Sequence, residues 1–200
     1  MVRSPSQTFI LTTDIRFPRM GMSYRRLLLT LPYLASLITL LILSSATSWF
    51  NIVENTFSDL GRIRNGLISV VFNGLVSSTG CLLILYSTLV FQELRLEYRL
   101  TLGLAGYFLT LIGVYPEDYG RLHFYVSLVF FLLGISYMVL HVAEHTIVGY
   151  AIAALGLLNF IPWSLHFALS EPRGAAIPEL VSLLSLLIAL AYDAGRLNSS

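Results

Sequence analysis

Charged residues are scarce in this sequence. They make up 12% of its 200 residues, whereas apolar and aromatic residues make up 56%, and the mean hydropathy is +0.77. In a soluble domain about a quarter of the residues are charged, because such side chains cover much of its surface. So small a charged fraction excludes an ordinary water-soluble domain and predicts a protein surrounded by lipid.

Lysine is absent and cysteine occurs once. All twelve basic residues are arginine, and eleven acidic residues leave a net charge of +1. This balance provides no basic face that could neutralise phosphates, so we expect no nucleic acid as a partner. The single cysteine, Cys81, excludes an intrachain disulfide, and its apolar surroundings in the sequence disfavour a reactive thiolate.

The spacing of the few charges predicts an all-α fold, a polytopic transmembrane bundle of six helices. Charge-free runs of about 17 residues or more can cross a bilayer, and the first five predicted helices contain such runs. The sixth has only thirteen uncharged residues, between Glu179 and Asp193, and spans only if Glu179 lies near the interface. We expect a cytoplasmic N-terminal segment at 1–25 that can be disordered, a membrane domain at 26–195 and a cytoplasmic tail at 196–200. The predicted helices are at about 27–47, 65–92, 100–116, 122–143, 146–169 (interrupted at Pro162) and 176–194.

Arginines near the helix ends predict the orientation, because cytoplasmic loops carry an excess of positive charge. With the N-terminus inside, eight arginines are cytoplasmic and four are outside. The two sets are Arg3, Arg16, Arg19, Arg25, Arg26, Arg95, Arg99 and Arg196, against Arg62, Arg64, Arg121 and Arg173. Six helices return the chain to its starting side. We therefore expect a multi-pass protein of the cell membrane with both termini cytoplasmic.

Small residues at helical spacing favour close helix contacts in lipid, where backbone approach takes the place of a hydrophobic driving force. Gly103, Gly106 and Gly113 are so placed in the third predicted helix, and Gly149 with Ala153 in the fifth. Besides membrane lipids as partners, the sequence leaves open a homo- or hetero-oligomer formed through these small-residue faces.

Polar residues gather in the three loops predicted on the outer side. The first contains the run Asn55-Thr56-Phe57-Ser58-Asp59-Leu60-Gly61, and the Phe72-Asn73-Gly74 segment follows it. The second contains Gly113-Val114-Tyr115-Pro116-Glu117, with His123 and Ser127 beyond it. The third contains Ala176-Ile177-Pro178-Glu179.

These pieces resemble the multi-pass membrane family catalogued as domain of unknown function 998. Its motifs are N-T-x-S-D-L-G, a G-x-[F/Y]-P-E…H…S pattern and, in archaeal members, A-I-P-E. Tyr115 stands where phenylalanine is commoner. The family is similar in outline to Frag-, DRAM- and Sfk-type membrane proteins, some of them tied to lipid remodelling. The resemblance therefore implies a helical membrane protein and, by distant analogy, a lipid-related role.

Asp59, Glu117, His123 and Glu179 come from four parts of the chain but from one predicted membrane face. In a compact bundle their side chains can converge, and convergent carboxylates with an imidazole can bind a divalent cation or perform acid–base chemistry. We take these four as the candidate catalytic residues; cofactor and metal stay unknown. The alternative is structural, because acidic side chains also stabilise helix starts and pair with nearby arginines.

His141 and His145 lie one helical turn apart, a spacing that can hold a metal ion. Membrane hydrolases of the alkaline-ceramidase type resemble this H-x-x-x-H pair. However, His123 precedes His141 by eighteen residues on one predicted helix, or about 27 Å, so His123 and Asp59 cannot share a metal with the pair. Glu144 is also misplaced for the metalloprotease motif H-E-x-x-H. We interpret the pair as helix-end residues at a cytoplasmic turn.

Three function classes follow from these observations, and whether the protein is an enzyme stays undecided. The first is a protein that binds or modifies a lipid headgroup or glycolipid at the outer face. The second is a structural or accessory membrane subunit with no catalytic site, and the third is a small transporter. A lack of ionisable residues at the predicted midplane weakens the third. Whether the four candidate residues face one cavity distinguishes the first two.

Overall fold

The computed structural model describes residues 22–90 and 94–196, which are largely helical and contain no strand. A π-helical turn, η3 (Tyr86–Val90), continues α2, and a 3₁₀ turn, η5 (Leu140–Glu144), continues α4. The predicted all-α class is confirmed. Most of the expected segments 1–25 and 196–200 lies outside the described residues. The α-helices are α1 (Met22–Ala46), α2 (Leu67–Leu85), α3 (Leu96–Val114), α4 (Arg121–Val139), α5 (Ile147–Leu158), α6 (Phe160–Leu169) and α7 (Ala176–Arg196).

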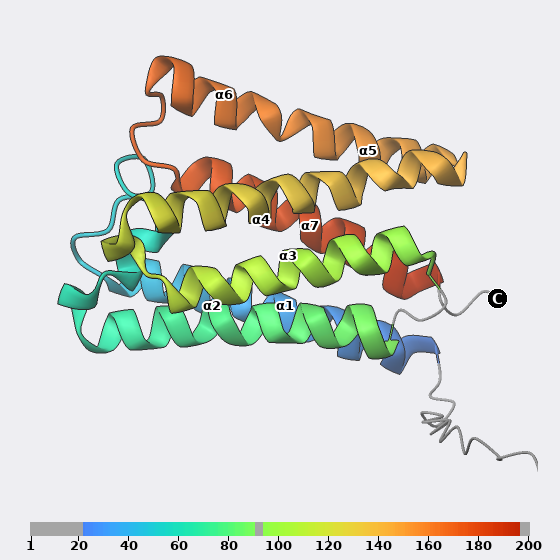
Figure 1. Ribbon diagram of the computed structural model, residues 1–200, viewed down its shortest axis with the longest axis horizontal. Coiled ribbons are helices and arrows are strands. Elements are labelled where there is room, and N and C mark those ends of the chain that lie inside the picture. Colours follow the sequence, from blue (N-terminus) through green and yellow to red (C-terminus); the bar gives the residue numbers. More distant parts are fainter. Residues whose placement is uncertain (1–21, 91–93, 197–200) are drawn as a thin grey trace, which may run out of the picture.

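The helices lie side by side as a bundle, with α5 and α6 end to end as one interrupted rod (Figure 1). α2 packs on α3, α3 on α4 and α4 on α5, while α7 contacts α1, α4, α5 and α6. The interruption at Asn159 has a local cause, because Pro162 in the first turn of α6 has no N–H to donate to the carbonyl of Leu158.

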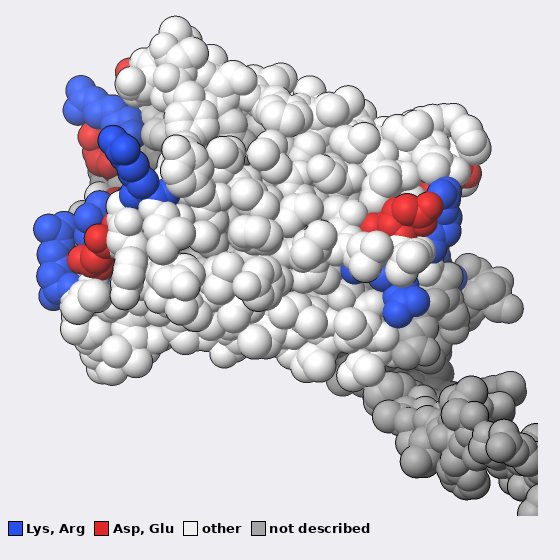
Figure 2. Space-filling model, viewed as in Figure 1, with Lys and Arg blue, Asp and Glu red and all other residues white. Residues whose placement is uncertain are grey.

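The bundle has two polar ends, which we name by the connections they carry (Figure 1). The loop end carries the connections at residues 47–66, 115–120 and 170–175. The terminal end carries the start of α1, the turn at residues 140–146 and the end of α7. Figure 2 shows acidic and basic residues gathered at these two ends, with an uncharged surface between them.

The surface between the two ends is apolar. Four helical segments are long and apolar enough to cross a membrane, and α1 adds a shorter apolar helix at Thr30–Ala46. α3 is as long as α2 but falls outside this group. Large apolar side chains such as Ile42 and Val70 are exposed on this surface. Such a belt is unfavourable in water and favourable in hydrocarbon, so the chain is an integral membrane protein. The four segments are Leu67–Leu89, Arg121–Glu144, Ile147–Leu169 and Ala176–Arg196.

Two buried apolar clusters hold the bundle together. The larger joins side chains of α2, α3, α4 and α7, among them Leu83, Leu102 and Leu190. The smaller lies beneath the loop end, where Phe57 and Leu60 from a short 3₁₀ helix, η1 (Phe57–Gly61), pack with α1 and α2. This second cluster anchors the connection between α1 and α2 to the membrane domain.

Glycines allow α2 and α3 to approach closely. A Cβ atom added at Gly80 would lie 2.5 Å from the carbonyl oxygen of Gly106, and one added at Gly106 would lie 2.7 Å from the carbonyl oxygen of Gly80. Gly113 likewise faces the backbone of α2 near Ser77. These members of the small-residue face predicted in the third helix therefore contact a helix of the same chain.

We predict that Gly80→Ala destabilises the protein by about 1–3 kcal/mol, because the new methyl group must push the two backbones apart. Thermal unfolding of the purified protein in detergent measures the effect. Gly74→Ala, in the same helix with open space around it, is the matched control and should be neutral or slightly stabilising, because alanine favours helix. Equal melting temperatures for the two variants would contradict close packing at Gly80.

Candidate functional site

The connection between α1 and α2 folds around a reciprocal cap at the start of η1. The hydroxyl of Thr56 accepts the N–H of Asp59 at 3.2 Å, and the carboxylate of Asp59 accepts the N–H of Thr56 at 2.9 Å. A threonine followed three residues later by an acidic residue is the sequence signature of such a cap. It fixes the direction in which Phe57 and Ser58 leave the turn.

The carboxylate of Asp59 accepts hydrogen bonds from residues of this loop. Besides the cap, it accepts a hydrogen bond from Nε of Arg62 at 2.9 Å and a longer one from the amide of Asn55 at 3.4 Å. Burial raises the pKa of the Asp59 carboxyl, but the hydrogen bonds from Thr56 and Arg62 outweigh it and lower that pKa below its ordinary value. Asp59 therefore stabilises the loop as an ionised cap.

Glu117 and His123 form a close pair across the connection between α3 and α4. Nε2 of His123 lies 3.1 Å from Oε2 of Glu117, and the imidazole is almost fully buried. Nδ1 of His123 lies 2.7 Å from the carbonyl oxygen of Tyr115, which can only accept, so Nδ1 carries a proton. Nε2 lies within hydrogen-bond distance of the carboxylate, so a proton can be held between them. The pair can donate this proton to a bound group or take one from it.

Hydroxyl groups surround the pair. Ser58 donates to Oε2 of Glu117 at 2.8 Å, and Oγ of Ser127 lies 3.4 Å from Nε2 of His123. Arg62 approaches the other carboxylate oxygen of Glu117 at 3.6 Å. Ser58, from the first polar loop, is thereby brought to Glu117 from the second.

Glu179 lies in the first turn of α7, and its carboxylate accepts the N–H of Phe57 at 2.8 Å. The chain just before it is bound to the same loop, because the N–H of Gly174 donates to Val53 at 2.7 Å and that of Ala176 to Asn55 at 3.0 Å. Gly174 is required there, since a Cβ atom would collide with the backbone of Asn55. These contacts hold Glu179 beside η1.

A cavity of about 630 Å³ opens between α4 and α6 at the loop end. α6 diverges from α4 toward this end of the bundle (Figure 1). Aromatic and aliphatic side chains of the two helices form most of the cavity wall, and hydroxyl, carboxyl and imidazole groups gather where η1 closes it. The hydroxyl, carboxyl and imidazole groups of the lining come from Thr56, Ser58, Glu117, His123, Ser127, Ser164, His166 and Glu179.

The four candidate residues thus divide into two groups. Glu117, His123 and Glu179 all line the cavity, whereas Asp59 is outside its lining and binds its own loop. Asp59 lies next to Ser58 in the sequence, but the turn of η1 directs the two side chains to different partners.

Sequence reasoning missed residues contributed by α6. His166 and Trp163 line the cavity, with Nδ1 of His166 at 2.8 Å from the carbonyl oxygen of Pro172. Trp163 stacks on Phe167 with ring centroids 5.7 Å apart. The aromatic content of 160–167 was a usable signal, but only the divergence of α6 from α4 shows that these rings face a cavity.

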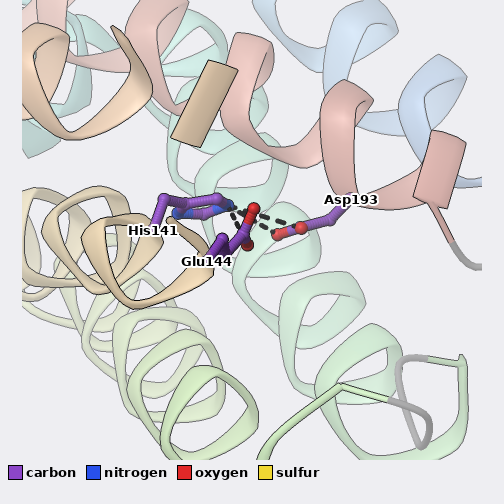
Figure 3. Close-up of side chains that lie close together, drawn as sticks. All are labelled: His141, Glu144 and Asp193. Atoms are coloured by element: carbon purple, nitrogen blue, oxygen red, sulfur yellow. Dashed lines mark hydrogen bonds and ion pairs between the residues drawn. The ribbon is translucent and has the colours of Figure 1, made fainter. Parts of the chain in front are cut away.

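A second group of ionisable side chains lies at the terminal end. His141, Glu144 and Asp193 converge there, with one potential ligand atom from each lying within 4.8 Å of the others (Figure 3). Among the described residues, this is the only group of histidine, cysteine and acidic side chains close enough to hold a metal ion.

The fold and the cavity define a helical integral membrane protein with a polar site at one end of its bundle. The chain matches the family described as protein of unknown function (DUF998) over residues 30–193 and belongs to that family. The resemblance found in the loop motifs is thereby confirmed. Comparisons with curated proteins and with solved structures gave no significant match.

We predict that Asp59→Asn destabilises the protein more at neutral pH than at low pH. Because folding lowers the pKa of Asp59 below 3.8, the unfolded chain takes up the proton first as the pH falls. The stabilisation is therefore fully present above about pH 5 and decreases through pH 3.8 toward the lower folded pKa. Unfolding of both proteins in an acid-tolerant detergent measures the difference. If the difference in stability between the two proteins stays constant from neutral pH to pH 3, which is about one unit below the ordinary pKa of aspartate, the result counts against an ionised cap.

Proposed function

We propose that the protein binds the hydroxyl-rich headgroup of a membrane lipid, such as a glycolipid, in the cavity between α4 and α6. The observation that supports this proposal is the separation of apolar and polar groups within the cavity. Its apolar walls lead to a group of carboxyl, imidazole and hydroxyl side chains at the loop end. Ligand sites of this kind combine a mostly apolar surface with a few placed polar groups.

The length of the cavity suits an acyl chain. Its α4 wall extends from His123 to Ile135, which at 1.5 Å per residue corresponds to about 18 Å along the helix. One leaflet of a bilayer contributes about 15 Å of hydrocarbon. A lipid whose headgroup contacts Glu117 and His123 can therefore lay one chain along Leu128, Phe131 and Ile135.

The charges of the cavity favour hydroxyl groups over phosphate. Glu117 and Glu179 both line it, and no arginine is among its described lining residues. An anionic phosphate would lie beside Glu117, whose arginine partner Arg62 is outside the cavity lining, whereas sugar hydroxyls can donate to carboxylates and to imidazole nitrogen. Trp163 keeps its N–H engaged with Ser182 at 3.1 Å, which leaves its ring to contact an apolar face of the headgroup.

We further propose that the loop end faces the outside of the cell membrane, with both termini cytoplasmic. The excess of arginine in the segments assigned to the cytoplasm supports this orientation. The start of α1 and the end of α7 lie together at the terminal end, in agreement with an even number of crossings (Figure 1).

Modification of the bound headgroup is a second candidate function. It is favoured by the close approach of Nε2 of His123 to Glu117 at 3.1 Å and by the hydroxyl of Ser127 at 3.4 Å from the same nitrogen. A positioned imidazole and carboxylate are the usual partners in general acid–base catalysis. The contacts of Asp59 and Glu179 with the backbone of η1 favour a structural role for those two residues instead.

We predict that Glu117→Gln weakens glycolipid binding at least about tenfold, because hydrogen bonds to a charged group contribute about 1.5–3 kcal/mol. The sequence contains two tryptophans, so the Trp49→Phe variant keeps a single tryptophan, Trp163, which lines the cavity. Titrating detergent-solubilised protein with a glycosyl diacylglycerol carrying brominated chains should quench its emission.

Glu54→Gln is the matched control, since Glu54 lies at the same end, pairs with exposed Arg173 and does not line the cavity. It should bind like the parent protein. Brominated phosphatidylglycerol and phosphatidylethanolamine should quench weakly in every variant. Quenching by phosphatidylglycerol equal to that by the glycolipid, or equal glycolipid affinity in Glu117→Gln and Glu54→Gln, would refute the proposed headgroup site.

A further inference from the structure

The terminal end contains a buried cluster that the cavity does not explain (Figure 3). His141 and Glu144 belong to the η5 turn after α4, and Asp193 belongs to the last turns of α7. The side chains of His141 and Asp193 are fully buried, and that of Glu144 is 9% exposed. Two carboxylates at such depth are costly unless positive charge accompanies them.

The spacing of the cluster fits a metal ion. Ligand atoms at about 2.1 Å from a tetrahedral ion lie about 3.4 Å from one another. Nε2 of His141 lies 3.3 Å from one oxygen of Asp193 and 3.4 Å from the other, and 3.9 Å from Oε1 of Glu144. Three protein ligands of this type, with a fourth position left for water, are the pattern of open zinc sites.

The imidazole of His141 is held with its ligand atom toward the carboxylates. Nδ1 lies 3.1 Å from the carbonyl oxygen of Tyr137 and 3.2 Å from that of Met138. Both oxygens can only accept, so Nδ1 carries a proton, and the lone pair of Nε2 is directed at Asp193. A lone pair facing a carboxylate requires a cation between them, either a proton or a metal ion. Metal-binding histidines are commonly held by such a backbone bond from their other nitrogen.

Tyrosine hydroxyls orient the two carboxylates. Tyr137 donates to Asp193 and Tyr192 donates to Glu144 at 3.0 Å, while the hydroxyl of Tyr98 is shared between Glu144 at 3.1 Å and the carbonyl oxygen of Leu140 at 2.8 Å. Hydrogen-bonded carboxylates and imidazole around an ion are the expected second layer of a metal site. The three tyrosines come from three different helices, so the arrangement depends on the packed bundle.

We infer that His141, Glu144 and Asp193 bind a divalent transition-metal ion such as Zn²⁺. Arg196 contacts both carboxylates in the structure and supplies one positive charge, and the second comes either from a proton on Nε2 of His141 or from a metal ion. A divalent ion balances both carboxylates and displaces the guanidinium. The side chain of Arg196 is 38% exposed, so it can turn outward.

The ion has a path to this site. A cavity of about 280 Å³ at the terminal end is lined by Glu144, Tyr98 and Tyr192, together with Arg95 and Arg196. Glu144 therefore connects the buried cluster with an opening that Arg196 borders. This site is independent of the headgroup cavity, because His123 and His141 are eighteen residues apart along α4 and η5, about 27 Å at helical rise.

His145 is not a member of the cluster. It is exposed, has a left-handed backbone with φ of 53° and approaches the hydroxyl of Tyr150 at 3.2 Å. His141 and His145, which the spacing in the sequence placed one turn apart, therefore do not form a pair of metal ligands. The structure pairs His141 with Asp193 of α7 instead, and this partnership is the basis of the inference.

Cobalt binding to tag-free protein in detergent tests the inference. Titrated Co²⁺ should give the visible absorption of a low-coordinate nitrogen–oxygen site at one equivalent, and Zn²⁺ should abolish it. Asp193→Asn and Glu144→Gln should each weaken Co²⁺ binding at least about tenfold. His145→Asn is the matched control and should bind like the parent protein. Arg196→Gln should bind more tightly, because the competing cation is gone; a purely structural ion-pair network predicts no such gain.

The inference is overturned if neither the parent protein nor Arg196→Gln binds Co²⁺ saturably, so that a proton alone occupies the cluster. It is also overturned if Asp193→Asn retains full affinity while His145→Asn loses it. If the buried Asp193→Asn variant does not fold, Glu144→Gln and Arg196→Gln decide, since both change less buried side chains. Neither result bears on glycolipid binding at the loop end.

Discussion

Hydrocarbon offers no hydrogen-bond partner to a peptide group, and this constraint shapes the whole molecule. The described chain satisfies it with helices whose exposed surface between the two ends is apolar. The same constraint moves ionisable side chains to the ends of the bundle, where water or an opposite charge can accompany them (Figure 2). In the described part of the chain, the acidic and basic side chains therefore gather at the loop end and the terminal end.

At the loop end, three connections behave as one structure. The η1 turn holds α7 through the bond from Phe57 to Glu179, and it reaches the α3–α4 connection through the bond from Ser58 to Glu117. Polar groups already engaged by the backbone, such as Asp59, stabilise this assembly. Glu117 and His123 engage each other and line the cavity.

At the terminal end, α4 and α7 meet around a buried histidine. Tyr137 and His141 are one helical turn apart, so both side chains face α7 and converge on Asp193. The α4–η5 segment thereby carries one imidazole–carboxylate pair at each end of the bundle, His123 with Glu117 and His141 with Asp193. The two pairs differ in surroundings, because the first borders a large apolar cavity and the second is enclosed by tyrosines.

The sequence by itself determined the helical class, the membrane setting and the family. These depend on composition, on the spacing of charges and on local motifs, which act over one helix or one turn. It also left open a structural role for the acidic residues of the loops, because an acidic side chain can stabilise the start of a helix next to it in the sequence.

Only the tertiary structure decided which polar residues share a site. It separated Asp59 from Glu117 and His123, added Trp163 and His166 through the divergence of α6, and brought Asp193 to His141 from 52 residues away. Such partnerships depend on which helices are neighbours and how each is rotated. In a lipid-exposed bundle nearly every helix face is apolar, so the sequence pattern does not specify that rotation.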